Sequence, residues 1–136
     1  MARFLSGLLA ALLLALPAFA QQPAAPLGVW RCVVNSPAVS IDLMMQVGPG
    51  GQLGGRGTIV YPSTGRIFNV EGPGDWTLMP PDASGPNWLF KFRMAPQNHA
   101  IFSWFASPTQ TPGILYNQFR DPQTGGIIET SCQRQG

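Results

Sequence analysis

Residues that favour turns interrupt this chain too often for long helices to form. It contains 16 glycines and 14 prolines among 136 residues. From Leu27 onward, pairs such as Pro-Gly, Gly-Gly and Gly-Pro recur about every ten residues, a spacing typical of all-β sandwiches and barrels. No window between these pairs carries an amphipathic helical pattern of useful length. The sequence therefore predicts an all-β fold.

The clearest strand is expected at residues 39–47. Every second residue from Val39 to Val47 is apolar, and the residues between them include Ser40, Asp42 and Gln46. A strict period of two over this length indicates a half-buried antiparallel strand. The other strands are expected at 27–34, 53–61, 66–71, 75–79, 87–94, 99–106, 113–120 and 127–132.

The order of these segments predicts how the sheet is closed. The Gly-Pro-Gly segment 72–74 is interpreted as a turn between two strands. The glycines within 54–57 mark a place where one strand bends sharply or lets another backbone approach closely. Eight or nine strands in one run leave exposed edges unless the sheet closes on itself. We therefore predict a single up-and-down antiparallel β-barrel of about eight strands, whose interior suits side chains or one small ligand.

The N-terminus has the three parts of a secretory signal peptide. Arg3 supplies a positive charge, an apolar run extends from Phe4 to Leu16, and Ala18-Phe19-Ala20 offers a cleavage site. The run is shorter than a transmembrane span of roughly 20 residues, although an uncleaved anchor is the alternative. We expect cleavage after Ala20, and export to the bacterial periplasm or the outside medium with no integral membrane span left.

The remaining chain is expected to hold one domain. Residues 21–26 contain two prolines and are interpreted as a disordered lead-in, and residues 27–136 as the β-barrel domain. Cys32 lies in the first expected strand and Cys132 in the last. Two cysteines in an exported chain favour a disulfide, which would fasten the ends of the sheet together and stabilise the fold by about 4.7 kcal/mol for a loop of about 100 residues.

The charge content excludes two classes of partner. Charged residues make up 10% of the chain, the formal net charge is +2, and Lys91 is the only lysine. Nucleic-acid binding requires clustered basic residues that displace counterions, so we expect no nucleic-acid partner. A polybasic patch for a membrane surface is also absent from this sequence.

The polar residues do not predict an enzyme. His99 is the only histidine, so a catalytic triad and a multi-histidine metal site are both excluded by count. Glu71 and Asp75 flank the Gly-Pro-Gly segment, but chance explains their proximity, and Asp82 lies in a proline-rich loop. We therefore expect no catalytic residues, no metal site and no cofactor.

Aromatic residues are the more informative group. The chain holds four tryptophans and eight phenylalanines. Ordinary core packing explains any one of them, but a pocket for a small apolar molecule would also be lined by such side chains. The residues expected to line it are Trp76, Trp88, Phe90 and Trp104.

Two functions from different classes follow. The first is an exported, non-catalytic barrel that holds a small apolar ligand inside. The alternative is a protein-interaction module of the cell envelope, such as a protease inhibitor or assembly factor, with self-association as one form. An outward Ile101 or Phe105 would then need cover from a neighbouring chain.

One short pattern resembles a known group of barrels. Gly28-x-Trp30 opens the first expected strand, and Arg134 follows the last. This pattern resembles the calycins, which include lipocalins and avidins, where a basic side chain near the closing strand covers a Trp of the first strand. The resemblance implies an up-and-down barrel with a ligand cup and a structural contact between Trp30 and Arg134. Small bacterial periplasmic protease inhibitors are similar to this pattern as well.

Overall fold

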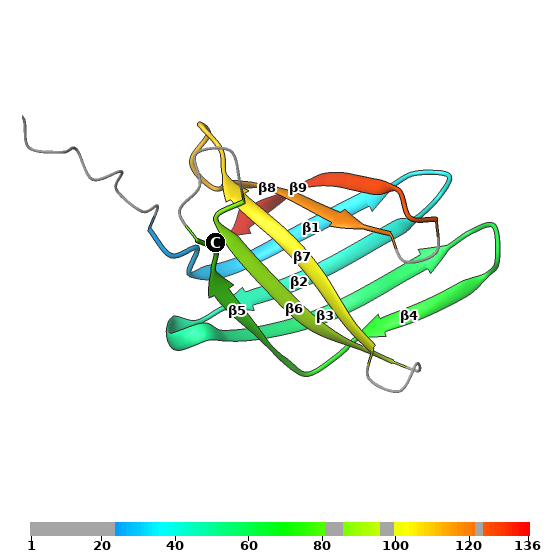
Figure 1. Cartoon of the computed structure of the whole chain (residues 1–136), viewed down its shortest axis with the longest axis horizontal. Helices are drawn as coiled ribbons and strands as arrows, with labels where there is room; N and C mark the ends of the chain where they lie inside the picture. The colour runs from blue at the N-terminus through cyan, green and yellow to red at the C-terminus, as the bar shows by residue number, and fades with distance from the viewer. Residues whose placement is uncertain (1–23, 81–85, 96–99, 122–123) are drawn as a thin grey trace, which may run out of the picture.

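The computed structural model describes residues 24–80, 86–95, 100–121 and 124–136, and they form one rolled β-sheet (Figure 1). The only helix in this part of the chain is the 3-10 turn η1, Pro49–Gly51, and no helix there is long and apolar enough to cross a membrane. The strands are β1 Gly28–Asn35, β2 Ser40–Val47, β3 Gln52–Tyr61, β4 Arg66–Val70, β5 Pro73–Leu78, β6 Trp88–Ala95, β7 Ala100–Pro108, β8 Ile114–Arg120 and β9 Ile127–Gln135.

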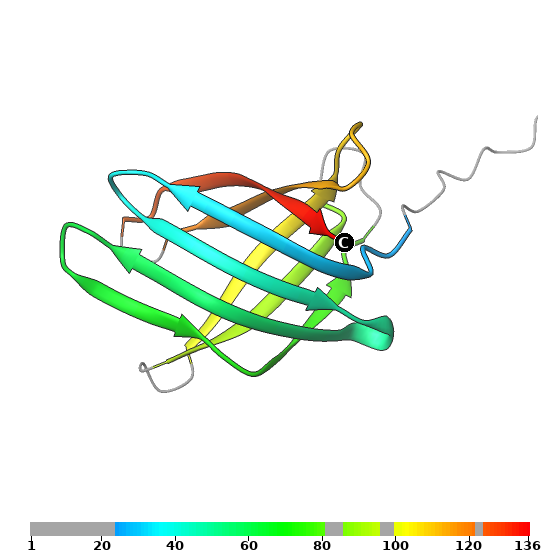
Figure 2. The same cartoon turned by 180° about the vertical axis from the view of Figure 1, so that it is seen from behind.

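The sheet closes into an antiparallel barrel with eight strand positions. Except for β4 and β5, which do not pair with each other, each strand pairs with its neighbours along the chain, and β9 returns to pair with β1. β4 and β5 occupy a single position, because both pair with β3 on one side and with β6 on the other. The predicted barrel of about eight strands is therefore confirmed. Figure 2 shows β1, β2, β3 and β4 side by side on one face.

The segment between β4 and β5 is a bulge, so its interpretation as a turn between two strands was wrong. Five residue steps separate Val70 from Asp75, whereas three steps separate their partners Met94 and Lys91 on β6. The extra residues bend the strand without reversing it. Gly72 has a φ of 71°, a conformation that favours glycine in turns and bulges alike.

Alternating side chains fill the barrel from all sides. In β2 every second residue from Ile41 to Val47 is buried, and in β6 the same holds from Trp88 to Met94. These residues belong to a single hydrophobic core to which every strand contributes. Aromatic rings meet edge to face within it, as between Phe92 and Trp104, whose ring centroids are 6.4 Å apart.

The predicted disulfide joins the first strand to the last. Cys32 and Cys132 are direct partners in the β1–β9 ladder and are bonded to each other. Both are fully buried. The side-chain amide of Asn117 on β8 donates a hydrogen bond to the sulfur of Cys132 over 2.8 Å, so the bridge is fixed from a third strand.

Arg134 and the chain before β1 cover the end of the barrel where both described termini lie. The Arg134 guanidinium carbon is 4.4 Å from the centroid of the Trp30 ring, and its Nη1 donates to the Leu27 carbonyl over 2.6 Å. The contact expected between Trp30 and Arg134 is thus present. Glycine is favoured at position 28 because its φ is 124°, and an added Cβ would also displace the guanidinium of Arg134.

Part of the segment interpreted as a disordered lead-in is packed in this structure. Pro26 is buried, and its carbonyl accepts a hydrogen bond from the Trp30 indole nitrogen over 2.8 Å.

At the opposite end of the barrel, the Tyr61 hydroxyl donates a hydrogen bond to the buried Asp121 carboxylate over 3.0 Å. Burial and this hydrogen bond raise the pKa of Tyr61 above its ordinary value.

Candidate functional site

The four residues expected to bind a ligand lie together inside the barrel. Trp76, Phe90 and Trp104 are successive partners across β5, β6 and β7, and Trp88 lies two residues before Phe90. None is more than 8% exposed. They are members of the packed core, where the ring of Trp104 lies 5.2 Å from that of Phe119 between centroids. The interior of this region is therefore occupied by the protein's own side chains.

Among the described residues, some buried polar atoms inside the barrel have no hydrogen-bond partner. The Trp88 indole nitrogen and the Asn117 side-chain oxygen are buried without a hydrogen bond. The two residues flank one small residue across three strands, because Ala106 on β7 pairs with Trp88 on β6 and with Asn117 on β8. Buried polar groups usually hold a partner or an ordered water, so these two atoms are exceptions within the packed core.

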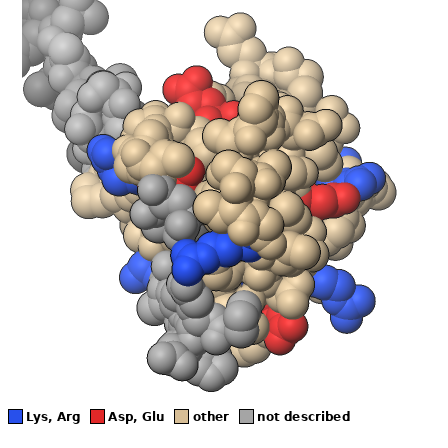
Figure 3. Space-filling view, turned by 90° about the vertical axis from the view of Figure 1, so that its right-hand side faces the viewer, with Lys and Arg blue, Asp and Glu red and all other residues tan. Residues whose placement is uncertain are grey.

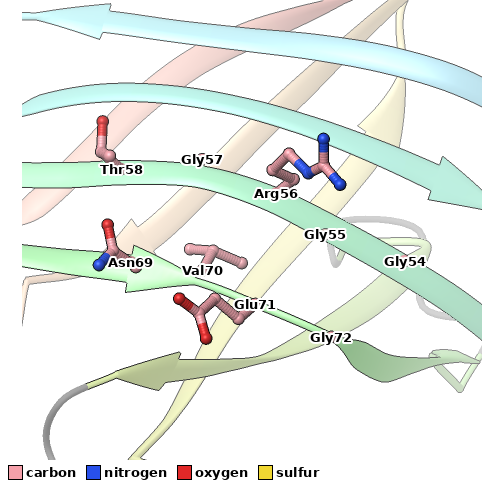
Figure 4. Close-up of a pocket in the computed structure, with 9 residues that line it drawn as sticks. All are labelled: Gly54, Gly55, Arg56, Gly57, Thr58, Asn69, Val70, Glu71 and Gly72. Atoms are coloured by element: carbon pink, nitrogen blue, oxygen red, sulfur yellow. The ribbon is translucent and has the colours of Figure 1, made fainter.

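The hollows described for this chain lie on the outer surface of β2, β3, β4 and β5. Three adjoining hollows have volumes of about 670, 560 and 430 Å³. All three are lined by Gly54, and two also by Gly55 and Arg56. We call the combined depression the Gly54 hollow. Figure 4 shows the largest of the three between β3 and the end of β4.

The three glycines of β3 differ in whether packing has room for a side chain in their place. At Gly57 a Cβ would overlap the backbone carbonyl oxygen of Asp42, and at Gly55 it would lie 2.7 Å from the Phe92 ring. Packing therefore requires both. At Gly54 the nearest atom to an added Cβ is the Cβ of Gln46, 3.9 Å away, which is an ordinary contact. The sheet has room for a side chain at Gly54, and its absence opens the hollow.

The rim of the hollow carries one cation and one anion. On facing strands, Arg56 comes just before and Glu71 just after the registered pair of Gly57 and Val70. Both side chains are exposed, and Figure 4 shows them directed away from each other. Within the described part of the chain neither forms an ion pair, whereas nearby Arg31 binds Asp42 at 2.9 Å.

Arg31 and Asp42 form an ion pair on the same outer face. Arg31 donates two hydrogen bonds to the Asp42 carboxylate, of 3.1 and 2.9 Å. The hydrogen bonding by Arg31 lowers the pKa of Asp42 below its ordinary value, against a small opposing effect of burial. Counted from Asp42 on β2, Arg56 lies on the next strand and Glu71 follows the strand after that. Both charged side chains can therefore bind an external partner.

The rest of the described surface carries scattered charges. Figure 3 shows an end of the molecule on which a few Lys, Arg, Asp and Glu side chains are spread over a mostly uncharged surface. Among the described residues no three His, Cys, Asp or Glu side chains are grouped as metal ligands would be. His99 and Asp82 lie outside the described residues, as does the side chain of Ile101. Phe105 is half-buried beside Leu89 on the outer face.

Sequence reasoning missed the hollow because the signal was given another meaning. Glycines within 54–57 were interpreted as a bend or as a close approach of another backbone. Gly57 fits the close approach, but the sequence does not distinguish a glycine that faces inward from one that faces outward. Comparisons with known proteins found no family model, no curated protein and no solved structure that matches this chain.

Proposed function

We propose that this protein is an exported, non-catalytic interaction module that recognises another protein chain with its outer surface, at the Gly54 hollow. One observation carries the proposal: the described hollows are on the outside of a barrel whose core is packed with large side chains. A ligand-carrying barrel would need space among those side chains. The barrel then acts as a rigid scaffold that holds the recognition surface in place.

The chemistry of the hollow suits a protein partner. Its wall combines Met44 and Val70 with the polar Asn69 and Thr58, and the charges of Arg56 and Glu71 stand at its rim. Mixed apolar and polar surfaces with Met and Arg are typical of protein interfaces. A closed barrel offers no free strand edge, so recognition must use side chains and exposed glycine backbone on a face of the sheet.

Site-specific photo-cross-linking in cells that export the full chain tests this function. A photoreactive amino acid is placed at Arg56 in the hollow, and in a second variant at Ser103, which is exposed on β7 across the barrel. We expect a defined protein adduct from position 56 and none from position 103. Adducts from both positions alike, or from neither, would contradict the proposed use of this face.

The second candidate is the ligand cup expected from the sequence. The unpartnered indole nitrogen of Trp88 favours it, because a polar atom of a bound molecule could accept that hydrogen bond. Titration of the intrinsic tryptophan fluorescence with lauric acid distinguishes the two functions. A saturable change that Trp88→Phe abolishes would favour the cup, and an unchanged spectrum up to the solubility limit would favour the interaction module.

A further inference from the structure

We propose that the Gly54 hollow binds a second copy of this chain, so that two barrels associate face to face about a twofold axis. This inference rests on the proposed function, because both place recognition on the outer face of β2, β3 and β4. It goes further by naming the partner. Three independent features of the face argue for it.

The first feature is the charge pattern of the rim. In a twofold dimer, residue i of one copy contacts residue j of the other, and residue j contacts residue i in return. A surface that presents one unpaired cation beside one unpaired anion meets this condition, because Arg56 of each copy can face Glu71 of the other. The two pairs form at once, and neither charge is left without a partner.

The second feature is a matching projection and depression. Met44 on β2 is 38% exposed and lines the smallest of the three hollows, next to Gly54. Methionine is flexible and adapts to irregular apolar surfaces. When two such faces meet about a twofold axis, the Met44 side chain of each copy can fill the depression that Gly54 leaves in the other. Both halves of the contact are present in a single chain.

The third feature is the lack of a structural reason for Gly54. A glycine inside a strand lowers stability relative to alanine, and neither backbone conformation nor packing requires glycine here. Gly55 and Gly57 in the same strand do have a packing reason. An open patch kept at a cost to the fold is explained if a neighbouring chain approaches the backbone at that point.

Charge exchange tests the arrangement with the protein itself. Sedimentation equilibrium of the mature chain is measured for the wild type, Arg56→Glu, Glu71→Arg and the double exchange. Each single exchange places like charges opposite each other twice, so we expect the dimer dissociation constant to rise about 100-fold or more. The double exchange restores opposite charges, and we expect it to recover the dimer.

A mixture gives the sharpest result. Arg56→Glu carries two anions at the rim and Glu71→Arg carries two cations, so the two monomeric variants should form a mixed dimer when combined. The matched controls are Arg120→Glu and Glu129→Arg, which make the same charge changes on the exposed outer face of β8 and β9. We expect both controls to dimerise like the wild type.

Filling the hollow provides a readout that does not depend on charge. Gly54→Gln should abolish the dimer while its circular dichroism spectrum stays that of the wild type. At low protein concentration, where both proteins are monomers, its unfolding midpoint should be at or above that of the wild type. A wild type that remains monomeric at millimolar concentration would overturn the inference, as would a dimer indifferent to these exchanges. A cross-link from position 56 to a different protein, with a monomer in solution, would leave the proposed function standing and remove only the self-association.

Discussion

Alanine at two glycines of the same strand is expected to change stability in opposite directions. In β3, Gly54 faces outward with room for a Cβ, whereas a Cβ at Gly57 would overlap the Asp42 carbonyl oxygen and lie 2.8 Å from the Leu43 Cα. Gly54→Ala should therefore stabilise the fold by about 0.5–1 kcal/mol, the usual cost of glycine in a strand. Gly57→Ala should destabilise it by about 1–3 kcal/mol, the usual cost of overpacking.

Urea unfolding followed by tryptophan fluorescence measures both changes. The four tryptophans report on the core, and the free energies of unfolding follow by linear extrapolation. The two variants add the same methyl group three residues apart in one strand, so they differ in what the added Cβ meets. The difference expected between their free energies of unfolding is about 1.5–4 kcal/mol.

One result would refute the reasoning behind the Gly54 hollow. If Gly54→Ala destabilised the monomer as much as Gly57→Ala, packing would require glycine at both positions. Gly54 would then have a structural explanation, and the argument that it is kept for contact with another chain would lose its basis. The measurement is made at low protein concentration, so that any association does not contribute to stability.

Three further changes test the covered ends and the closure of the barrel. Gly28→Ala should displace the guanidinium over Trp30 and lower the unfolding midpoint, because its φ of 124° and the close guanidinium both disfavour a Cβ; an unchanged midpoint would contradict this. Replacing Cys32 and Cys132 by alanine should lower the free energy of unfolding by about 4.7 kcal/mol or less, as measured in urea against the oxidised wild type. Tyr61 keeps its proton in the fold, so its contribution to stability is complete below pH 10 and is lost as the pH rises above that value. Between pH 9 and 11, the thermal unfolding midpoint of Tyr61→Phe should fall less than that of the wild type. An equal fall in both proteins would refute the assignment of this pH dependence to Tyr61.

Periodicity and turn residues predicted most of the fold. The limits expected for the strand at 39–47 differ from β2 by one residue, and Trp88, Phe90 and Met94 lie on the buried face as their spacing indicated. Local pattern works here because inward and outward positions alternate strictly along a half-buried strand. The disulfide followed from the positions of the two cysteines in the first and last strands.

The features that were missed depend on neighbours far away in the sequence. Whether Gly72 forms a turn or a bulge is decided by the register against β6, and both conformations use the same residues locally. Whether Gly54 is packed or open is decided by the side chain of Gln46 on β2. Neither contact can be read from a single strand, so the sequence placed its candidate residues inside the barrel and did not predict the Gly54 hollow on its outer surface.

The pairing of β1 with β9 has a consequence for how the chain reaches its native state. β1 precedes all the other strands along the chain, whereas its partner β9 follows all of them. Until the final segment arrives, the growing sheet carries two open edges that can pair with other chains. Completion of the ring therefore waits for β9, and removal of the whole of β9 would leave the edges of β1 and β8 unpaired.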